Sequence, residues 1–220
     1  MEIKLSTQLP NDISLAYTEI EFQNNDKLPM FWEEQLNPLI ERIGQHDTLA
    51  TIREDPIIQV TKKLYRTLGK DPSRFRPSSD SLLRRVVKGK GLYQVNALVD
   101  LNNYLSLKYR LPFGSYDLER IQGAITLTKG QSNQEYPGIG KKMINLENLL
   151  ILEDQQGPFG SSTSDSTRTM IKKSTTHAVI VCYAFSQSAK MLANMQIDIE
   201  KLIKQYVNST KVLKQELVIK

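Results

Sequence analysis

The chain changes from helical to extended patterning within Val95-Asn-Ala-Leu-Val-Asp-Leu-Asn-Asn-Tyr-Leu-Ser-Leu-Lys-Tyr-Arg-Leu-Pro-Phe-Gly114. Apolar residues recur at helical spacing as far as Arg110, and the following Leu111-Pro-Phe-Gly114 stops the helix because proline cannot continue it. Before this stretch the pattern predicts further helices, and after it mainly strands separated by turns. Helices early in the chain and strands late in it indicate an α+β domain.

Local signals place the other elements. Asp55 and Pro56 supply an N-cap and a first-turn proline for a helix that Gly69 closes. Ser78-Ser-Asp80 predicts the cap of the next helix. Helices are expected over 27–45, 57–68, 78–88, 95–110 and 187–207, and strands over 13–22, 124–129, 149–153, 178–185 and 212–219. We expect a strand and helical extension over 1–69, followed by one domain over 70–220.

Charge is distributed unevenly along the chain. The whole sequence carries 29 basic and 24 acidic side chains, yet residues 1–61 carry 4 basic and 11 acidic ones. Residues 62–90, here the basic block, carry 10 basic and 2 acidic ones, interleaved with Tyr65 and Phe75. Cations mixed with aromatic rings suit contacts to phosphates and bases. The alternative is that the acidic N-terminal segment packs against the block and neutralises it.

Several classes of protein are excluded at this level. The longest apolar run, Ala178–Phe185, is far shorter than the roughly 20 residues of a membrane helix. The start Met1-Glu-Ile-Lys4 lacks the features of a secretory signal, so we expect a cytoplasmic protein without membrane contact. A single cysteine, Cys182, excludes an internal disulfide and is expected to be a buried structural thiol. We expect no metal or other cofactor, because His46 and His177 lack ligand spacing.

Two loops have weak catalytic signals. Gly138-Ile-Gly-Lys-Lys142 hints at a phosphate loop, but it lacks the full glycine spacing and the Ser or Thr, so a hairpin turn is the better interpretation. Gly160–Thr169 holds seven hydroxyl side chains but no nucleophile elbow. It is interpreted as a mobile connector, with closure over a polar ligand as the alternative.

The helix from Val95 has a polar face as well as an apolar one. Asn96, Asp100 and Asn103 fall at positions i, i+4 and i+7, so their side chains share one face. Asn and Asp are poor helix formers, so three of them in register indicate a polar cluster. That cluster either bonds neighbouring backbone or lines a pocket.

Seven short motifs, in this order and spacing, resemble the B3/B4 domain of the phenylalanyl-tRNA synthetase beta subunit, and most of all its free-standing relatives. They are Arg76-Pro-Ser-Ser79, Leu82-Leu-Arg-Arg85, Lys88-Gly-Lys-Gly91, Val95-Asn-Ala-Leu-Val-Asp100, Asn103-Tyr104, Leu111-Pro-Phe-Gly-Ser-Tyr-Asp117 and Asp165-Ser-Thr-Arg-Thr169. The resemblance covers roughly residues 70–185. It implies a layered β/β/α fold and a pocket near the helix from Val95, which in the synthetase hydrolyses tyrosine wrongly esterified to tRNA.

The resemblance also implies departures at the pocket. The family's asparagine is kept as Asn103, its neighbouring threonine becomes Asn102, and its pocket histidine falls on Gly114. The glutamate that reads the tyrosine hydroxyl falls on Val181, which cannot accept a hydrogen bond. Tyrosine is therefore not expected to be discriminated as in the synthetase.

Asp100 and Asp117 are interpreted mainly as structural residues that bond backbone at the pocket floor. Arg168 is expected either to pair with Asp165 or to meet a ligand anion. The full predicted pocket is Asn96, Asp100, Asn102, Asn103, Gly114, Ser115, Tyr116, Asp117, Asp165 and Arg168.

Three functions remain open. The first is a tRNA- or RNA-binding protein with an aminoacyl-like pocket. The second is a trans-acting aminoacyl-tRNA hydrolase of altered specificity, and the third is an amino-acid-binding protein without RNA. Full synthetase activity is not expected, and the catalytic residues and the oligomeric state stay unknown. The predicted RNA contacts are Arg74, Arg76, Arg84, Arg85, Lys88 and Lys90.

Overall fold

The computed structural model describes residues 1–25, 27–140 and 143–220. Its helical segments are α1 (Pro29–Phe31), a π-helical turn η1 (Trp32–Leu36), α2 (Asn37–His46), α3 (Leu49–Glu54), α4 (Pro56–Leu68), α5 (Ser78–Val87), α6 (Ala97–Tyr109), a 3₁₀ turn η2 (Leu118–Arg120) and α7 (Ala189–Tyr206). Its strands are β1 (Ile3–Leu5), β2 (Ile13–Glu21), β3 (Phe113–Asp117), β4 (Ile125–Lys129), β5 (Glu135–Pro137), β6 (Met143–Asn145), β7 (Leu150–Asp154), β8 (Gly157–Ser161), β9 (His177–Phe185) and β10 (Lys211–Ile219).

The central layer is an antiparallel sheet in the order β10-β2-β9-β3. Its middle strand β9 is buried on both faces, as the continuous apolar run predicts. Val179, Val181 and Tyr183 face one hydrophobic core. The alternate residues of the strand, among them Ile180 and Cys182, face a second core.

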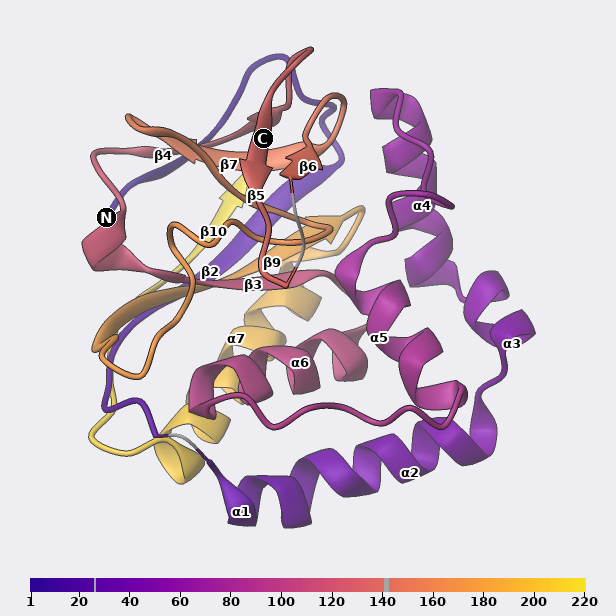
Figure 1. Ribbon diagram of the computed structural model, residues 1–220, viewed down its shortest axis with the longest axis vertical. Coiled ribbons are helices and arrows are strands. Elements are labelled where there is room, and N and C mark those ends of the chain that lie inside the picture. The colour runs from indigo at the N-terminus through magenta and orange to yellow at the C-terminus, as the bar shows by residue number, and fades with distance from the viewer. Residues whose placement is uncertain (26, 141–142) are drawn as a thin grey trace.

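A second sheet, β1-β4-β7-β8, covers the face of the central sheet that carries Val181. Strand β1 runs parallel to β4, whereas β7 pairs antiparallel with both β4 and β8. The opposite face of the central sheet is covered by α6 and α7, with α1 and α2 packed outside them (Figure 1). The layers are therefore β/β/α, and the predicted α+β class is confirmed.

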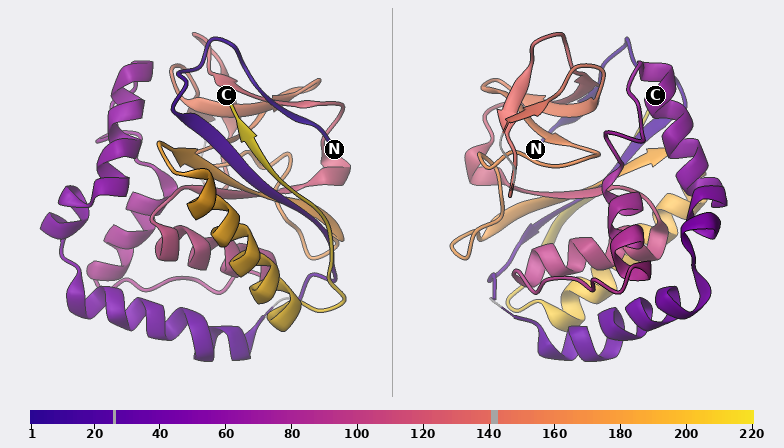
Figure 2. Two further views of the ribbon diagram at one scale, coloured as in Figure 1. Left: turned by 180° about the vertical axis from the view of Figure 1, so that it is seen from behind. Right: turned by 45° about the vertical axis from the view of Figure 1, so that its right-hand side comes forward.

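Helices α3, α4 and α5 lie together along one side of the layered body, beside the two sheets (Figure 2). Asp55 caps α4 by accepting hydrogen bonds of 3.0 Å from the amides of Ile57 and Ile58, and Gly69 ends it at φ 91°. A left-handed residue at this position favours glycine, which has no Cβ to clash. The predicted helix boundaries at Asp55 and Gly69 are confirmed.

The predicted cap of α5 is wrong. Pro77 is the N-cap residue, and it makes no side-chain hydrogen bond. Ser79 and Asp80 lie inside the first turn and are fully buried, while the amide of Ser78 donates to Ser162 O at 2.9 Å. A backbone contact from a distant loop therefore satisfies a donor that a side chain was expected to cap.

The Gly160–Thr169 loop is held inside the protein rather than forming a mobile connector. Ser162 and Thr169 are fully buried, and strand β8 extends through Ser161. The preferred hairpin interpretation of 138–142 agrees with the antiparallel pairing of β5 with β6 on either side. Lys141 and Lys142 of that motif lie outside the described residues.

Strand β2, from the predicted N-terminal extension, lies inside the central sheet between β10 and β9. The proposed boundary after residue 69 stays a prediction. Among the described residues, no helix is both long enough and apolar enough to cross a membrane.

Candidate nucleic-acid interface

Three hollows on the α4–α5 side of the protein share the side chain of Arg76. Their volumes are about 300, 410 and 500 Å³. Arg84 lines both the 300 Å³ and the 410 Å³ hollow, and Ser81 lines both the 300 Å³ and the 500 Å³ hollow. Together they form one continuous surface, which we call the Arg76 surface. It is lined by Arg53, Gln59, Lys62, Arg66, Pro72, Ser73, Arg74, Phe75, Arg76, Asp80, Ser81, Arg84, Arg85, Lys88, Lys90, Met143, Ile144, Asn145 and Thr163.

The first hollow is almost purely cationic. It is lined by Arg76, Arg84, Arg85, Lys88 and Lys90, with Ser81 as the remaining residue. The guanidinium of Arg85 donates to Gly91 O at 2.7 Å and to Lys90 O at 3.2 Å, and it lies 4.3 Å from the ring centroid of Tyr93. Arg85 thus fixes the turn after α5, which leaves the exposed Lys88 and Lys90 to face solvent.

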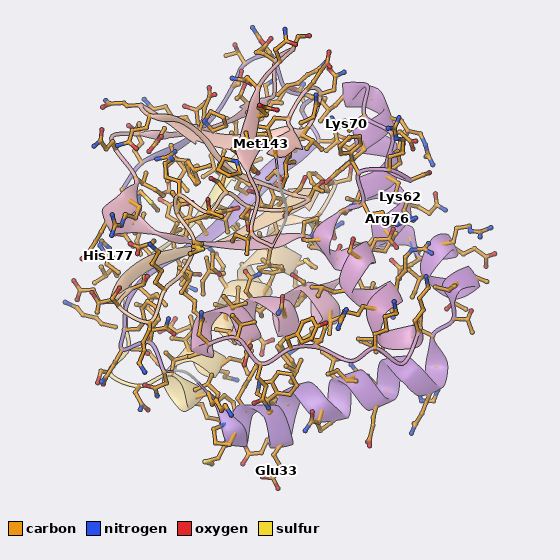
Figure 3. The ribbon with its side chains drawn as sticks, viewed as in Figure 1. Glu33, Lys62, Lys70, Arg76, Met143 and His177 are labelled. Carbon is orange, nitrogen blue, oxygen red and sulfur yellow. The ribbon has the colours of Figure 1, made fainter. Side chains whose placement is uncertain are left out.

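The second hollow contains a buried carboxylate. Asp80 is fully buried, and its Oδ1 accepts a hydrogen bond from Arg84 Nε at 2.8 Å. Its Oδ2 lies 3.2 Å from Lys62 Nζ of α4. The same hollow is lined by Arg53 of α3, Arg66 of α4 and Arg76, so five cations surround one acid. Figure 3 shows Lys62 and Arg76 together where α4 passes α5.

The third hollow combines cations with apolar groups. Arg74 and Arg76 stand beside Phe75, Met143 and Ile144. Lys70 Nζ lies 3.8 Å from the centroid of the Phe75 ring. Lys70 also donates to three oxygens, Asn145 O, Asn145 Oδ1 and Glu147 O, so it ties the loop after α4 to the strand β6. Burial lowers the pKa of Lys70, and the carboxylate of Glu147 partly offsets that effect.

All six predicted RNA contacts line the Arg76 surface, although their role in binding stays a prediction. Arg53, Lys62 and Arg66 were not among the predicted contacts. Lys62 and Arg66 carry the signal of the basic block itself. Arg53 lies on α3, a helix that the sequence pattern did not reveal, so only the packing of α3 beside α4 brings it here.

The polar face of α6 does not act as one unit. Asn96 is the N-cap and accepts from the amide of Val99 at 3.0 Å. Asp100 is buried and accepts from Trp32 Nε1 at 2.7 Å and from the amide of Val95 at 3.0 Å. Burial raises the pKa of Asp100, and those two bonds partly offset it. The side chain of Asn103 is partly exposed and makes no hydrogen bond within the described residues.

The neighbouring strand residues also bond within the protein. Asn102 accepts from the hydroxyl of Ser115 at 2.9 Å and donates to Phe113 O at 3.3 Å. Asp117 accepts from the Thr175 hydroxyl at 2.7 Å and from the amide of Glu119. For Asp100 and Asp117, these bonds match the structural interpretation.

A buried cluster of tyrosines fills the space around Gly114. The fully buried Tyr116 ring lies against Gly114 and Gly160, and its hydroxyl donates to Asp165 Oδ1 at 2.8 Å. The hydroxyl oxygen of Tyr183 lies 2.7 Å from the hydroxyl oxygen of Tyr116. Burial, together with the charge of Asp165, raises the pKa of both phenols, so both stay protonated at neutral pH.

Two further tyrosines bond the hydroxyl-rich loop. Tyr65 OH lies 2.6 Å from Ser162 Oγ and 2.9 Å from Thr163 Oγ1, and burial raises the pKa of Tyr65 to about 12. Tyr136 OH donates to Ser164 O at 2.6 Å. The hydroxyls of Ser162 and Thr163 are thus already bonded inside the protein, whereas the buried hydroxyl of Thr169 has no hydrogen-bond partner among the described residues.

Arg168 does not form the expected pair with Asp165. Its guanidinium makes two hydrogen bonds, of 2.9 and 3.0 Å, with the buried carboxylate of Asp154 and two more with Gly157 O and Gln156. Burial alone would raise the pKa of Asp154, but the bonds from Arg168 and from the amides of Gln122 and Gln156 outweigh it and lower that pKa. None of the ten predicted pocket residues lines the three hollows described above, so the pocket stays a prediction.

Arg168→Met is expected to lower the free energy of unfolding at pH 7 by about 2 kcal/mol, because it leaves the buried carboxylate of Asp154 without its charged partner. The pKa of Asp154 is lowered in the folded state, so this contribution is present above its unfolded pKa and is lost as the pH falls. The difference between the two proteins should therefore shrink towards pH 3, as measured by urea denaturation across pH. A difference that stays constant with pH would contradict this role for the ion pair.

A family model described as the B3/4 domain matches residues 60–214. The phenylalanine–tRNA ligase beta subunit of Zymomonas mobilis is 27% identical over 123 residues, which cover 55% of this chain and 16% of that protein. The beta subunit of Rickettsia conorii is 29% identical over 130 residues, covering 44% of this chain and 16% of that protein.

Among solved structures, an N-terminal fragment of the phenylalanyl-tRNA synthetase beta subunit from Pyrococcus horikoshii is 11% identical, with a TM-score of 0.49. The match covers 99% of this chain and 50% of that fragment. The two ligase subunits above are matched over 16% of their own length, so the chain corresponds to a small part of either protein.

Proposed function

The chain belongs to the B3/4 domain family, and on that premise we propose that it binds tRNA, or another RNA, through the Arg76 surface. The curated relatives named above are phenylalanine–tRNA ligase beta subunits. Phosphate contacts from Arg and Lys supply most of the sequence-independent affinity for a nucleic acid. Aromatic side chains beside them suit stacking by unpaired bases.

One feature of the surface supports this proposal above all others. Three hollows converge on Arg76, an exposed side chain with no hydrogen-bond or ion-pair partner among the described residues. A polyanion crossing all three hollows would contact Arg76 throughout. Phe75 of the third hollow would then offer a ring to a base beside the charged track.

Among the described residues, no acid of the N-terminal segment forms an ion pair with this surface. Between the described residues, each ion pair of the basic block is made with Asp80, which itself belongs to the block. The acids Asp47 and Asp55 instead pair with Arg110, beyond the block. The excess positive charge is therefore available to an external anion, which favours the RNA interpretation over internal neutralisation.

Ester hydrolysis and amino-acid binding have no comparable support. The hydroxyls of Ser162 and Thr163, and most of the predicted pocket groups, are bonded to other groups of the protein. No described group among them is placed as a general base towards a hollow. The proposal therefore rests on the family and on the Arg76 surface, and not on the predicted pocket.

Replacing Arg76 tests the proposal. Arg76→Ala is expected to weaken the binding of unmodified tRNA and to reduce the slope of log K against log salt by about one, because one phosphate contact is lost. Fluorescence anisotropy at four or more salt concentrations would measure both quantities.

Arg42→Ala is the matched control, since Arg42 is an exposed arginine of α2 that lines none of the three hollows. It should change neither affinity nor slope. Binding that is absent at low salt, insensitive to salt, or equally reduced by both substitutions would refute the proposed surface.

A further inference from the structure

The second hollow of the Arg76 surface differs from its neighbours because a buried carboxylate holds two of its cations in place. Five cations, Arg53, Lys62, Arg66, Arg76 and Arg84, line about 410 Å³ of space with Asp80 as the only acid among its lining residues. The cations come from α3, α4, α5 and the loop before α5. Three helices therefore contribute positive charge to one hollow.

Asp80 fixes two of these cations without using up their donors. Arg84 uses Nε for its 2.8 Å bond to Asp80, so neither terminal nitrogen is occupied by a described residue. Lys62 is 9% exposed, and its ammonium lies 3.2 Å from the other carboxylate oxygen. An ammonium has three donors, so Lys62 retains hydrogen-bonding capacity towards the hollow. Lys62 and Arg84 are therefore positioned before any ligand arrives, which lowers the entropy cost of binding.

The net positive charge of the hollow favours a ligand that carries more than one negative charge. Asp80 neutralises one of five positive charges, which leaves four around the hollow. An internal phosphodiester brings a single negative charge and two accessible oxygens. A phosphate monoester carries about −1.5 to −2 charges near pH 7 and three strong acceptor oxygens. Arginine binds such groups bidentately, and several cations can share the three oxygens.

We propose that this hollow binds a phosphate monoester, namely the terminal phosphate of an RNA chain. The choice of RNA as the source rests on the proposed function, whereas the choice of a monoester rests on the hollow itself. The first hollow, with the exposed Lys88 and Lys90, then follows the adjoining phosphodiester backbone. Binding at the Arg76 surface thereby starts from an end of the strand.

Single-stranded 12-mer RNAs of one sequence test the proposal. They would carry a 5′-phosphate, a 3′-phosphate, or hydroxyls at both ends, and their affinities for the full chain would be measured by anisotropy. One phosphorylated form is expected to bind about tenfold more tightly than the hydroxyl form, since it adds charge-assisted hydrogen bonds. Arg66→Gln and Arg53→Gln should each reduce that ratio towards one.

Two substitutions serve as controls. Lys63→Gln, on the same helix but outside all three hollows, should leave the affinities and their ratio unchanged. Lys88→Gln, in the first hollow, should weaken phosphorylated and hydroxyl RNA to the same degree and preserve the ratio. Because Arg66 and Arg53 are exposed, their replacement should leave the melting temperature unchanged within error.

The outcomes separate this inference from the proposed function. Equal affinity for all three RNAs would overturn the terminal-phosphate site while leaving RNA binding intact. A phosphate preference that survives Arg66→Gln and Arg53→Gln would overturn its location. If no RNA binds, calorimetry with AMP against adenosine decides. If AMP binds, adenosine does not, and Arg66→Gln abolishes the binding of AMP, the hollow is a monoester site for a free nucleotide. If AMP does not bind, the proposed site is overturned.

Discussion

Gly114→Ala is expected to lower the free energy of unfolding by about 3 kcal/mol or more, because a Cβ at this position would lie 2.1 Å from Tyr116 Oη. A phenol at the end of a flexible side chain can normally move aside. Tyr116 cannot, since a Cβ on Gly160 would lie only 2.5 Å from the same oxygen and two hydrogen bonds hold the hydroxyl. Two glycines from facing sheets thus enclose one tyrosine.

A double-mutant cycle identifies Tyr116 as the cause. Tyr116→Ala alone should cost about 3–5 kcal/mol through the cavity it leaves. In the presence of Tyr116→Ala, Gly114→Ala should add little, so the two effects should fall short of additivity by at least about 1 kcal/mol. Guanidinium denaturation would measure all four proteins.

Gly44 provides the control for the glycine substitution. It lies in α2, and a Cβ on it would have no atom within 4 Å, so Gly44→Ala should be neutral or should stabilise by about 0.5–1 kcal/mol through helix propensity. If Gly114→Ala were as harmless as Gly44→Ala, the tight enclosure of Tyr116 would be contradicted. If the two effects of the cycle were additive, the contact between Gly114 and Tyr116 would not be their cause.

The elements that the sequence predicts well are those whose signals are local. Asp55 and Gly69 delimit α4 because capping and left-handed backbone are properties of a few neighbouring residues. Alternation identifies β2, and the apolar run identifies β9. Strand β8, Gly157–Ser161, was missed because its glycines and proline are typical of turns. Its pairing with β7, and the ring of Tyr116 over Gly160, make it a strand.

The candidate site shows the same division between local and distant signals. Six cations of the Arg76 surface were predicted because charge can be counted along the chain. The partners of buried polar groups could not be predicted in this way. Trp32, which donates to Asp100, is 68 residues distant, and Asp154, which binds Arg168, had no pattern to single it out. Helical spacing placed Asn96 and Asp100 together, but it could not show that Asn96 caps the helix while Asp100 bonds Trp32.

Asp80→Ala is expected to lower the free energy of unfolding by about 3 kcal/mol, since it leaves the buried ammonium of Lys62 without its counter-charge. Asp80 also lies in the first turn of α5, where a negative charge favours the helix dipole, and it bonds Arg84 one turn later. Three contributions are therefore lost with one carboxylate. Urea denaturation at pH 7 would measure the change.

A second substitution, Lys62→Met, shows which of the three contributions of Asp80 to stability is the largest. Adding Lys62→Met to Asp80→Ala removes the uncompensated charge, and an apolar side chain of similar length can fill its place, so most of the lost stability should return. Glu41→Ala, which removes an exposed acid of α2, should change the stability by less than about 0.5 kcal/mol. If the double variant were no more stable than Asp80→Ala, the helix-dipole and Arg84 contributions would outweigh the buried ion pair. A recovery would show that the buried ion pair adds little net stability, so that the main effect of Asp80 is to hold Lys62 and Arg84 beside the second hollow.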